Sequence, residues 1–277
     1  MASQPINDGF FVRMTVIILC RLVSLRCLRW LFPRAGPVTF LAPKLCVKST
    51  SFSSLAEASA MRFVAEHTPI PVPKVYSAFE HNGRVYIVME RIEGVMLARG
   101  WRRRTPESRA RILGSLRGMM QQMRQIPAPA AGCCGVSNVD GGPIYDARLP
   151  GPSFWGPFRT IRDFHRELRA GVDEPEYAGV AIPELGPLIA FHNRPWPDPV
   201  FSHGDLSSLN ILARGDDVVG IVDWETAGWM PPYWEYTSAW NVNPQNQFWQ
   251  QEVDHFLEPL PEALAMEATR RKYNNDY

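Results

Sequence analysis

Two short segments of the sequence carry side chains that could hold a metal ion and activate a hydroxyl group. The first contains His203, Asp205 and Asn210, and the second is the apolar run 218–222, which is followed by Asp223. Phosphoryl transfer from a nucleotide needs a carboxylate that orients the attacking hydroxyl and further oxygen atoms that bind Mg²⁺. We therefore predict that Asp205 accepts the hydroxyl proton and that Asn210 and Asp223 are metal ligands.

An apolar hairpin is expected to bring these residues together. Residues 210–213 and 218–222 flank the turn 214–217, Arg-Gly-Asp-Asp, and this pattern is typical of two paired strands. Pairing places Asp223, at the end of the second strand, beside Asn210, at the start of the first. The spacing therefore connects the two segments into one predicted metal site.

Each of these residues also has an interpretation that involves no chemistry. Asp205 could be a turn residue, and Asn210 could begin a strand for structural reasons alone. His203, which we group with Asp205 as a catalytic candidate, is expected to hydrogen-bond the loop backbone and to be structural. Asp223 is harder to dismiss, because an unpaired carboxylate buried in an apolar strand is costly. The joint spacing favours a functional site.

The composition is typical of a soluble globular protein. Of 277 residues, 45% are hydrophobic and 21% are charged, and this length allows one large core or two modest ones. The formal net charge of +1 gives no overall case for nucleic-acid binding. The five cysteines are an odd number without zinc-ligand spacing, so we expect free thiols, including the adjacent Cys133 and Cys134, in a reducing compartment.

The N-terminal segment has two open interpretations. Residues 10–32 are strongly apolar, but arginines interrupt them, and the longest run without a charge, 14–20, is far shorter than the ~20 residues that span a bilayer. No clean small-residue cleavage site follows, which argues against a signal peptide. The segment could be a basic amphipathic helix on a membrane surface. We favour the alternative, a helix that packs against the domain with its arginines in water.

The pattern of elements predicts an α+β fold in three parts. A basic apolar arm occupies residues 1–34, a small lobe with a sheet and a helix occupies 35–92, and a larger, mainly helical lobe occupies 93–277. Apolar periodicity and turn residues predict strands over 45–48, 74–79 and 84–92, and helices over 54–67, 160–170, 182–193 and 247–272.

Two further features belong to the large lobe. Thr105 and Pro106 mark the start of a helix whose methionines are expected to fill the core. Residues 127–159 are rich in proline and glycine, and this segment is too long for a passive turn in a compact domain. We predict that it is a functional loop.

Residues 203–205, His-Gly-Asp, together with Asn210 and residues 221–225, Ile-Val-Asp-Trp-Glu, resemble the aminoglycoside phosphotransferase family. That family includes choline-kinase-like enzymes and belongs to the protein-kinase-like superfamily. Gly204 stands where protein kinases usually have arginine, and Trp-Glu follows Asp223 where they have Phe-Gly. Both differences resemble the branch that acts on small molecules.

The resemblance extends over residues 40–240, and residues 86–94 and 137–143 are similar to fungal members of the family. It implies a bilobal protein-kinase-like fold that transfers the terminal phosphate of ATP, or alternatively GTP, to a hydroxyl group of a small molecule with the help of Mg²⁺. We expect a cytoplasmic monomer whose partner is this small-molecule acceptor and not nucleic acid.

The resemblance also implies residues of the nucleotide site. Lys48 matches the lysine that contacts phosphates, and Glu57 matches its ion-pair partner. A competing interpretation makes Glu57 the third residue of a capping box that begins at Ser54. Glu90 and Ile92 lie in the hinge that meets the adenine edge. Glu225 could assist the metal or could be a structural acid.

The sequence departs from the family before Lys48. No Gly-x-Gly-x-x-Gly loop precedes this lysine, and residues 37–41 are interpreted as one strand at most, where the family has two. A catalytically weak or inactive nucleotide-binding module is therefore kept as an alternative. A protein kinase is a second alternative, against which Gly204, Glu225 and the lack of an Ala-Pro-Glu segment argue. A metallophosphoesterase would need more His and Asp ligands in paired motifs than the six scattered histidines supply.

Overall fold

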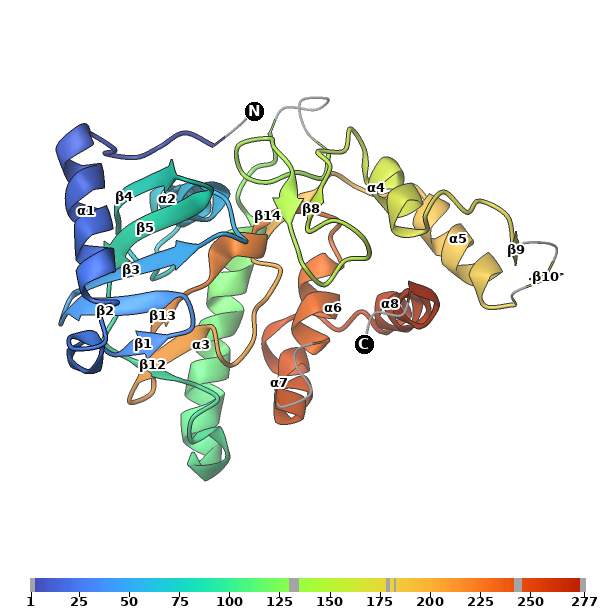
Figure 1. The fold of residues 1–277 in the computed structure, drawn as a ribbon. Coiled ribbons are helices and arrows are strands. Elements are labelled where there is room, and N and C mark those ends of the chain that lie inside the picture. The colour runs from blue at the N-terminus through green and yellow to red at the C-terminus, as the bar shows by residue number, and fades with distance from the viewer. Residues whose placement is uncertain (1–2, 130–134, 178–179, 182, 242–245, 275–277) are drawn as a thin grey trace.

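A computed structural model describes residues 3–129, 135–177, 180–181, 183–241 and 246–274. The chain forms a small lobe built on a sheet and a larger, mainly helical lobe (Figure 1). The small-lobe sheet is antiparallel, with the order β1-β2-β3-β5-β4. Its strands are β1 (Arg34–Ala35), β2 (Val38–Ala42), β3 (Leu45–Thr50), β4 (Val75–His81) and β5 (Arg84–Glu90).

One helix covers each face of this sheet. The alternation of side chains in β5 explains the arrangement: Ile87 and Met89 join the core beneath α2 (Ala56–His67), whereas Tyr86 and Val88 face α1 (Phe10–Leu22). The N-terminal helix therefore packs against the domain, as we favoured. A short turn, η1 (Arg29–Leu31), follows it.

The large lobe is organised around one long helix, a three-stranded sheet and a strand pair. The helix α3 (Pro106–Arg124) begins at Thr105, whose side chain accepts a hydrogen bond from the Ser108 amide at 3.3 Å, as predicted. The strands β6 (Val95–Met96), β12 (Ile211–Arg214) and β13 (Asp217–Ile221) form one sheet, and β11 (Val200–Ser202) pairs with β14 (Gly228–Met230).

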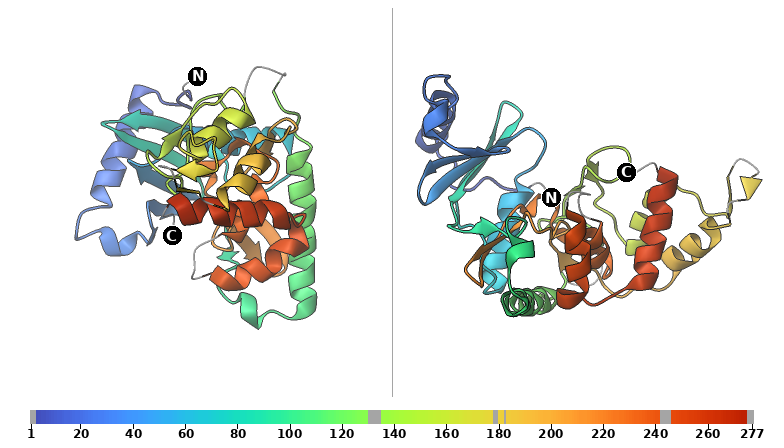
Figure 2. Two further views of the ribbon diagram at one scale, coloured as in Figure 1. Left: turned by 90° about the vertical axis from the view of Figure 1, so that its right-hand side faces the viewer. Right: turned by 90° about the horizontal axis from the view of Figure 1, so that it is seen from below.

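The remaining elements of this lobe are short helices, turns and two-residue strands. They are η2 (Trp101–Arg103), β7 (Ile144–Tyr145), β8 (Phe154–Trp155), α4 (Ile161–Leu168), β9 (Glu176–Tyr177), β10 (Val180–Ala181), α5 (Leu185–Asn193), η3 (Trp224–Thr226), α6 (Trp234–Trp240), α7 (Gln247–Phe256) and α8 (Pro261–Asn274). The view from below shows α4, α5 and α8 extending the large lobe away from the sheet (Figure 2, right).

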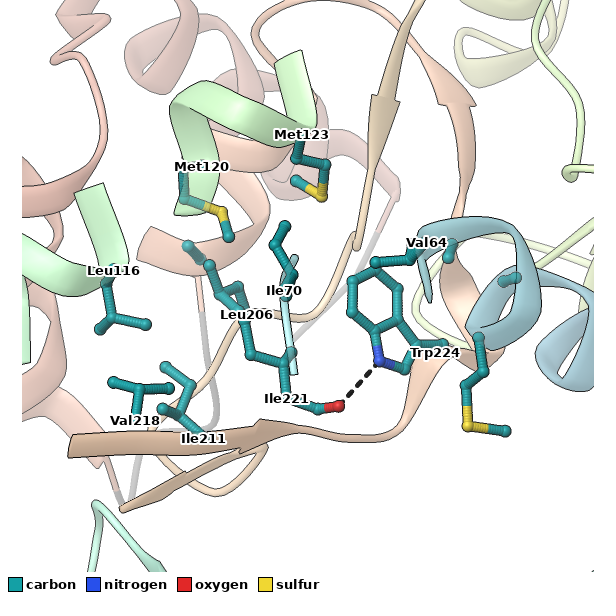
Figure 3. Packing of buried hydrophobic residues seen from close by; sticks show 14 of the residues in the cluster. Val64, Ile70, Leu116, Met120, Met123, Leu206, Ile211, Val218, Ile221 and Trp224 are labelled. Atoms are coloured by element: carbon teal, nitrogen blue, oxygen red, sulfur yellow. Dashed lines mark hydrogen bonds between the residues drawn. The ribbon is translucent and has the colours of Figure 1, made fainter. Parts of the chain in front are cut away.

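A single apolar core continues from α2 of the small lobe into α3 of the large lobe. Figure 3 shows Met120 and Met123 packed beside Leu206 and Ile221, which confirms that these methionines fill the core. The Trp224 indole donates a hydrogen bond to the Ile221 carbonyl at 2.9 Å. The end of the β12–β13 hairpin is thereby fixed in the centre of the molecule.

Three expectations need correction. Two strands precede Lys48 rather than one, because Gly36, at φ +54°, turns the chain so that the very short β1 pairs with β2. The predicted helix 247–272 is two helices, α7 and α8, because the two prolines of residues 257–261 interrupt it. The helix predicted over 54–67 begins at Ala56.

Cys133 and Cys134 lie outside the described residues, whereas Cys20, Cys27 and Cys46 are free. Among the described residues, no helix is both long enough and apolar enough to cross a bilayer.

Candidate active site

The β12–β13 hairpin joins the two chemistry-bearing segments as predicted. Ile211 pairs with Ile221, and the Val222 amide donates to the Asn210 carbonyl at 2.9 Å. Asp223 then leaves the strand at φ +67°, a left-handed conformation that is uncommon for a residue other than glycine. The chain turns there into η3, and Asp223 follows directly after the residue that is hydrogen-bonded to Asn210.

The loop that carries Asp205 is held by a buried carboxylate from α6. Glu235, 1% exposed, accepts hydrogen bonds from the amides of His203 at 2.5 Å and Gly204 at 3.3 Å. Glycine is required at position 204 because φ is +79° and a Cβ atom would lie 2.9 Å from the Thr226 carbonyl oxygen. Glu235 was not predicted, although an acid among the apolar and aromatic residues 233–240 was a signal for a buried, partnered group.

His203 lies behind this loop and not at its surface. Its Nε2 is 3.0 Å from the Val222 carbonyl, and its Nδ1 accepts a hydrogen bond from the Asp205 amide at 3.1 Å. The ring packs edge-on against Trp224 and is fully buried, and this burial lowers its pKa. The neutral imidazole connects the two segments of the site through backbone groups, the structural role expected for it.

Asp205 is fixed by two side chains. The Asn210 amide nitrogen donates to the Asp205 carbonyl at 2.8 Å and to its carboxylate at 3.0 Å, which leaves the Asn210 side-chain oxygen as the atom that could reach a metal. On its other oxygen, Asp205 accepts a hydrogen bond from Arg148 at 3.1 Å. Burial raises the pKa of Asp205, and the neighbouring charge of Asp223 adds to this effect, whereas Arg148 opposes it.

Arg148 belongs to the loop predicted to be functional but was not itself predicted. Its guanidinium binds both carboxylate oxygens of Asp146 at 2.8 Å and donates to the Gly204 carbonyl at 2.6 Å. Burial alone would raise the pKa of Asp146, but Arg148 brings it below its usual value. A half-buried ion pair from residues 144–155 therefore supports the Asp205 loop from the side opposite Asn210.

Lys48 connects the small lobe to the second segment. Its ammonium lies 2.8 Å from Glu57, 2.6 Å from Asp223 and 2.9 Å from Glu225. Burial alone would lower the pKa of Lys48, but the three carboxylates raise it above its usual value. Glu57, 1% exposed, contacts Lys48 at 2.8 Å and accepts a hydrogen bond from the Ser53 hydroxyl at 3.4 Å. The N-cap residue of α2 makes no side-chain hydrogen bond, so the geometry favours the ion pair over the capping box.

The donor set around Lys48 fits a hard divalent cation. Oxygen atoms of Glu57, Asp223 and Glu225 lie within 4.8 Å of one another, and carboxylate and amide oxygens are the ligands that Mg²⁺ prefers. The side chains of Asp223 and Glu225 are 39% and 28% exposed, whereas Glu57 is enclosed by the protein. Asp223 and Glu225 are thus the two members that remain accessible to a metal or a phosphate.

A cavity of about 370 Å³ lies next to this cluster, between β2 of the small lobe and β12 of the large lobe. Glu90 and Ile92 line it, together with Val38 and Met89, and Val222 connects it to Asp223. The structure therefore places the predicted hinge residues in one cavity and Lys48, Glu57 and Asp223 in one adjacent cluster. The predicted roles of all these residues stay predictions.

Comparison with known proteins identifies the family. Residues 45–273 match the phosphotransferase enzyme family. No curated protein matches the sequence. Among solved structures, a thermostable mutant of aminoglycoside phosphotransferase APH(4)-Ia in its apo form is 19% identical, with a TM-score of 0.57 and coverage of 86% of this chain and 79% of that one.

Two other structures have a similar fold. The streptomycin–ATP–APH(2")-IIa ternary complex is 12% identical, with a TM-score of 0.59 and coverage of 97% of this chain and 89% of that one. ADP-bound APH(2'')-Ib is 14% identical, with a TM-score of 0.53 and coverage of 87% and 79%. The TM-scores of these three structures show a shared fold, which confirms the predicted bilobal, kinase-like architecture. The family match covers most of the sequence, and the chain belongs to the phosphotransferase enzyme family.

Proposed function

We propose that this phosphotransferase moves the terminal phosphate of ATP to a hydroxyl group of a small molecule, with Asp205 as the residue that receives the hydroxyl proton. The observation that carries the proposal is the hairpin that joins the Asp205 loop to Asp223, which in turn contacts Lys48 at 2.6 Å. One carboxylate for the acceptor, one for a metal and one cation for phosphates are thereby held together where the hairpin meets the small lobe.

The groups of the chain divide the reaction between them. Asp205 accepts a hydrogen bond from the acceptor hydroxyl and takes its proton as the oxygen forms a bond to the terminal phosphorus. The bond from that phosphorus to the bridging oxygen breaks, and ADP leaves with the electron pair. Lys48 provides positive charge for the phosphates that are not transferred, and Glu57 holds it in position from the buried side.

Asn210 and Asp223 are the proposed Mg²⁺ ligands, with Glu225 close enough to assist. Bound there, the metal would supply positive charge against the phosphate oxygens. In the structure Lys48 is shared among three carboxylates. The accessible Asp223 and Glu225 are therefore the groups able to exchange this contact for a metal or a nucleotide.

Similar structures support ATP as the donor. Related structures are described as complexes of an APH(4)-Ia mutant with ADP or with AMP-PNP, each together with hygromycin B, and of APH(2")-IIa with streptomycin and ATP. Such complexes favour an adenine nucleotide in the cavity beside Glu90 and Ile92, with GTP as the alternative. For this chain we propose a hydroxylated small molecule as the acceptor class.

One observation favours a second candidate, a nucleotide-binding module with weak or no transfer. The β1–β2 hairpin lines the proposed nucleotide cavity with Arg34, Ala35, Val38 and Phe40, but it is short, because β1 has only two residues. A short hairpin covers less of a bound nucleotide and reduces the protein contacts to its phosphates. This candidate predicts binding of ATP without acceptor-dependent release of ADP.

The test is a screen of hydroxylated metabolites for acceptor-dependent ADP release with Mg²⁺ and ATP. Asp205→Asn should lower the rate by at least about a hundredfold, because it removes the general base. Asp217→Asn is the matched control, since it removes an exposed acid at the turn of the same hairpin and should leave the rate unchanged. If Asp205→Asn retains full activity, the assignment is wrong. Stabilisation by ATP without any turnover would favour the binding module.

A further inference from the structure

The outward side of α1 and of the turn after it carries a continuous row of large apolar side chains in contact with solvent. We call Phe11, Met14, Ile18, Leu22, Leu25 and Trp30 the apolar stripe. The spacing from Phe11 to Leu22 is three or four residues at each step, which places these side chains on one side of α1. Leu25 and Trp30 follow in the turns after the helix. Phe11 is 84% exposed and Trp30 is 79% exposed, so the ends of the stripe are almost fully in water.

The stripe is distinct from the side of α1 that packs on the sheet. Val16 and Ile17 are 8% and 4% exposed and contact Val47, Phe79 and other residues of the sheet's outer face. In Figures 1 and 2, α1 lies at the outer end of the small lobe, away from the helices of the large lobe. The helix therefore has two apolar sides, and the fold uses only one of them.

Positive charge borders the stripe, and acidic residues are missing from this stretch of the sequence. Residues 9–56 contain no Asp or Glu. Arg21 and Arg26 are exposed, adjoin Leu22 and Leu25 in the sequence, and form no ion pair within the part of the chain that the structure describes. The nearby acid Asp8 is occupied by Arg13 at 2.6 Å.

We infer that the apolar stripe docks on an anionic lipid surface as a peripheral membrane contact. An amphipathic helix of this kind lies in the plane of the interface, with its apolar side chains among the acyl chains and its arginines at the headgroups. Trp30 fits this position because indole rings prefer the membrane–water interface. Under this inference, each of the two interpretations of residues 10–32 applies to one side of the helix.

The charge of the stripe argues against a second copy of the chain as its occupant. Two stripes packed face to face in a symmetric dimer would bring the arginines of both copies toward one another, with no acid between residues 9 and 56 to compensate them. An anionic bilayer instead supplies the opposite charge along the whole stripe. It also accepts a narrow apolar row without the shape complementarity that a protein partner needs.

The experiment is flotation of the full chain with phosphatidylcholine vesicles and with vesicles that also contain phosphatidylserine. We expect binding only to the second kind, weakened by added salt because the arginines act through screened charge. Arg21→Gln/Arg26→Gln should weaken this binding by about 30-fold, since each basic residue near an anionic surface contributes about 1 kcal/mol.

A matched pair of variants tests the apolar part. Phe11→Ser should abolish most of the binding, whereas Phe52→Ser, which changes a phenylalanine that is 73% exposed outside the stripe, should keep it. Both positions are exposed, and unchanged thermal melts would show that both variants fold. Equal binding of the two variants, equal binding to both vesicle types or no binding at all would overturn the inference. So would a dimer in sedimentation that Phe11→Ser converts to monomer.

Discussion

Replacing Arg148 with methionine tests whether the ionised carboxylate of Asp205 is the group that receives the hydroxyl proton. The guanidinium donates to Asp205 at 3.1 Å and to the Gly204 carbonyl at 2.6 Å, so it stabilises the charged form of Asp205 directly. Methionine keeps much of the length of the side chain but removes the charge and all donors. The pKa of Asp205 should therefore rise further above its usual value.

The size of this rise follows from the geometry. Two unit charges about 3 Å apart interact by about 5 kcal/mol at an effective dielectric constant of about 20. The Arg148 and Asp205 side chains are 32% and 34% exposed, and solvent screens a pair of this kind strongly. We expect the pKa of Asp205 to rise by about one unit, the lower end of the shifts that an adjacent opposite charge causes.

Asp146 complicates the single variant, because Arg148 is also its partner and its side chain is only 5% exposed. An unpaired buried carboxylate costs about 3–5 kcal/mol of stability. The double variant Asp146→Asn/Arg148→Met removes both charges and should recover most of that loss. Arg148→Lys keeps the charge but cannot bind two oxygens of one carboxylate. In this variant the pKa of Asp205 should stay close to its value in the original chain.

The assay is the pH dependence of kcat/KM for acceptor-dependent ADP release. The acid limb should move to higher pH by about one unit in Arg148→Met. It should move by less in the double variant, because the charge of Asp146 itself raises the pKa of Asp205. NMR titration of the carboxylate, assigned with Asp205→Asn, measures the same shift without an acceptor. An acid limb that stays in place while the NMR titration moves would refute the proton-accepting role of Asp205.

Two further predictions concern buried charge. Lys48→Met should raise KM for the nucleotide and destabilise the fold by about 3 kcal/mol, because Glu57 loses its partner; urea unfolding should show that adding Glu57→Gln restores part of the stability. Burial lowers the pKa of His165 to about 4 and that of His192 to about 2, so below about pH 6.5 the unfolded chain binds more protons and stability falls as pH falls. Each histidine adds up to about 1.4 kcal/mol per pH unit to the slope of the unfolding free energy against pH. His192→Phe should remove the contribution of His192 to this slope, and an unchanged slope would contradict the prediction.

The site could be predicted from the sequence where its contacts are local. The β12–β13 hairpin needs only a turn and two apolar runs, and it is enough to place Asn210 beside Asp223. The strand order of the small lobe and the exact start of α2 depend on packing between distant segments. The two strands before Lys48 were counted as one because β1 is only two residues long, too short to give a periodic pattern.

Arg148 and Glu235 could not be predicted for a different reason. Arg148 contacts Asp205 across 57 positions of the sequence, and Glu235 contacts His203 across 32. No spacing rule connects such residues, since their neighbourhood exists only after the large lobe has folded. The sequence contains only a weak signal for each residue. For Arg148 it is a loop too long to be a passive turn, and for Glu235 it is an acid within an apolar, aromatic helix.

These distant contacts separate the position of Asp205 from the binding of the nucleotide. The Asp205 loop is held by Glu235 of α6, by Arg148 of the 144–155 loop and by Asn210, all of which belong to the large lobe. The short β1–β2 hairpin contributes to the nucleotide cavity and makes none of these contacts in the described residues. A weak hairpin should therefore raise KM for the nucleotide while it leaves Asp205 in position. We therefore expect the departure from the family before Lys48 to affect how well ATP is held, and it is not by itself an argument against transfer.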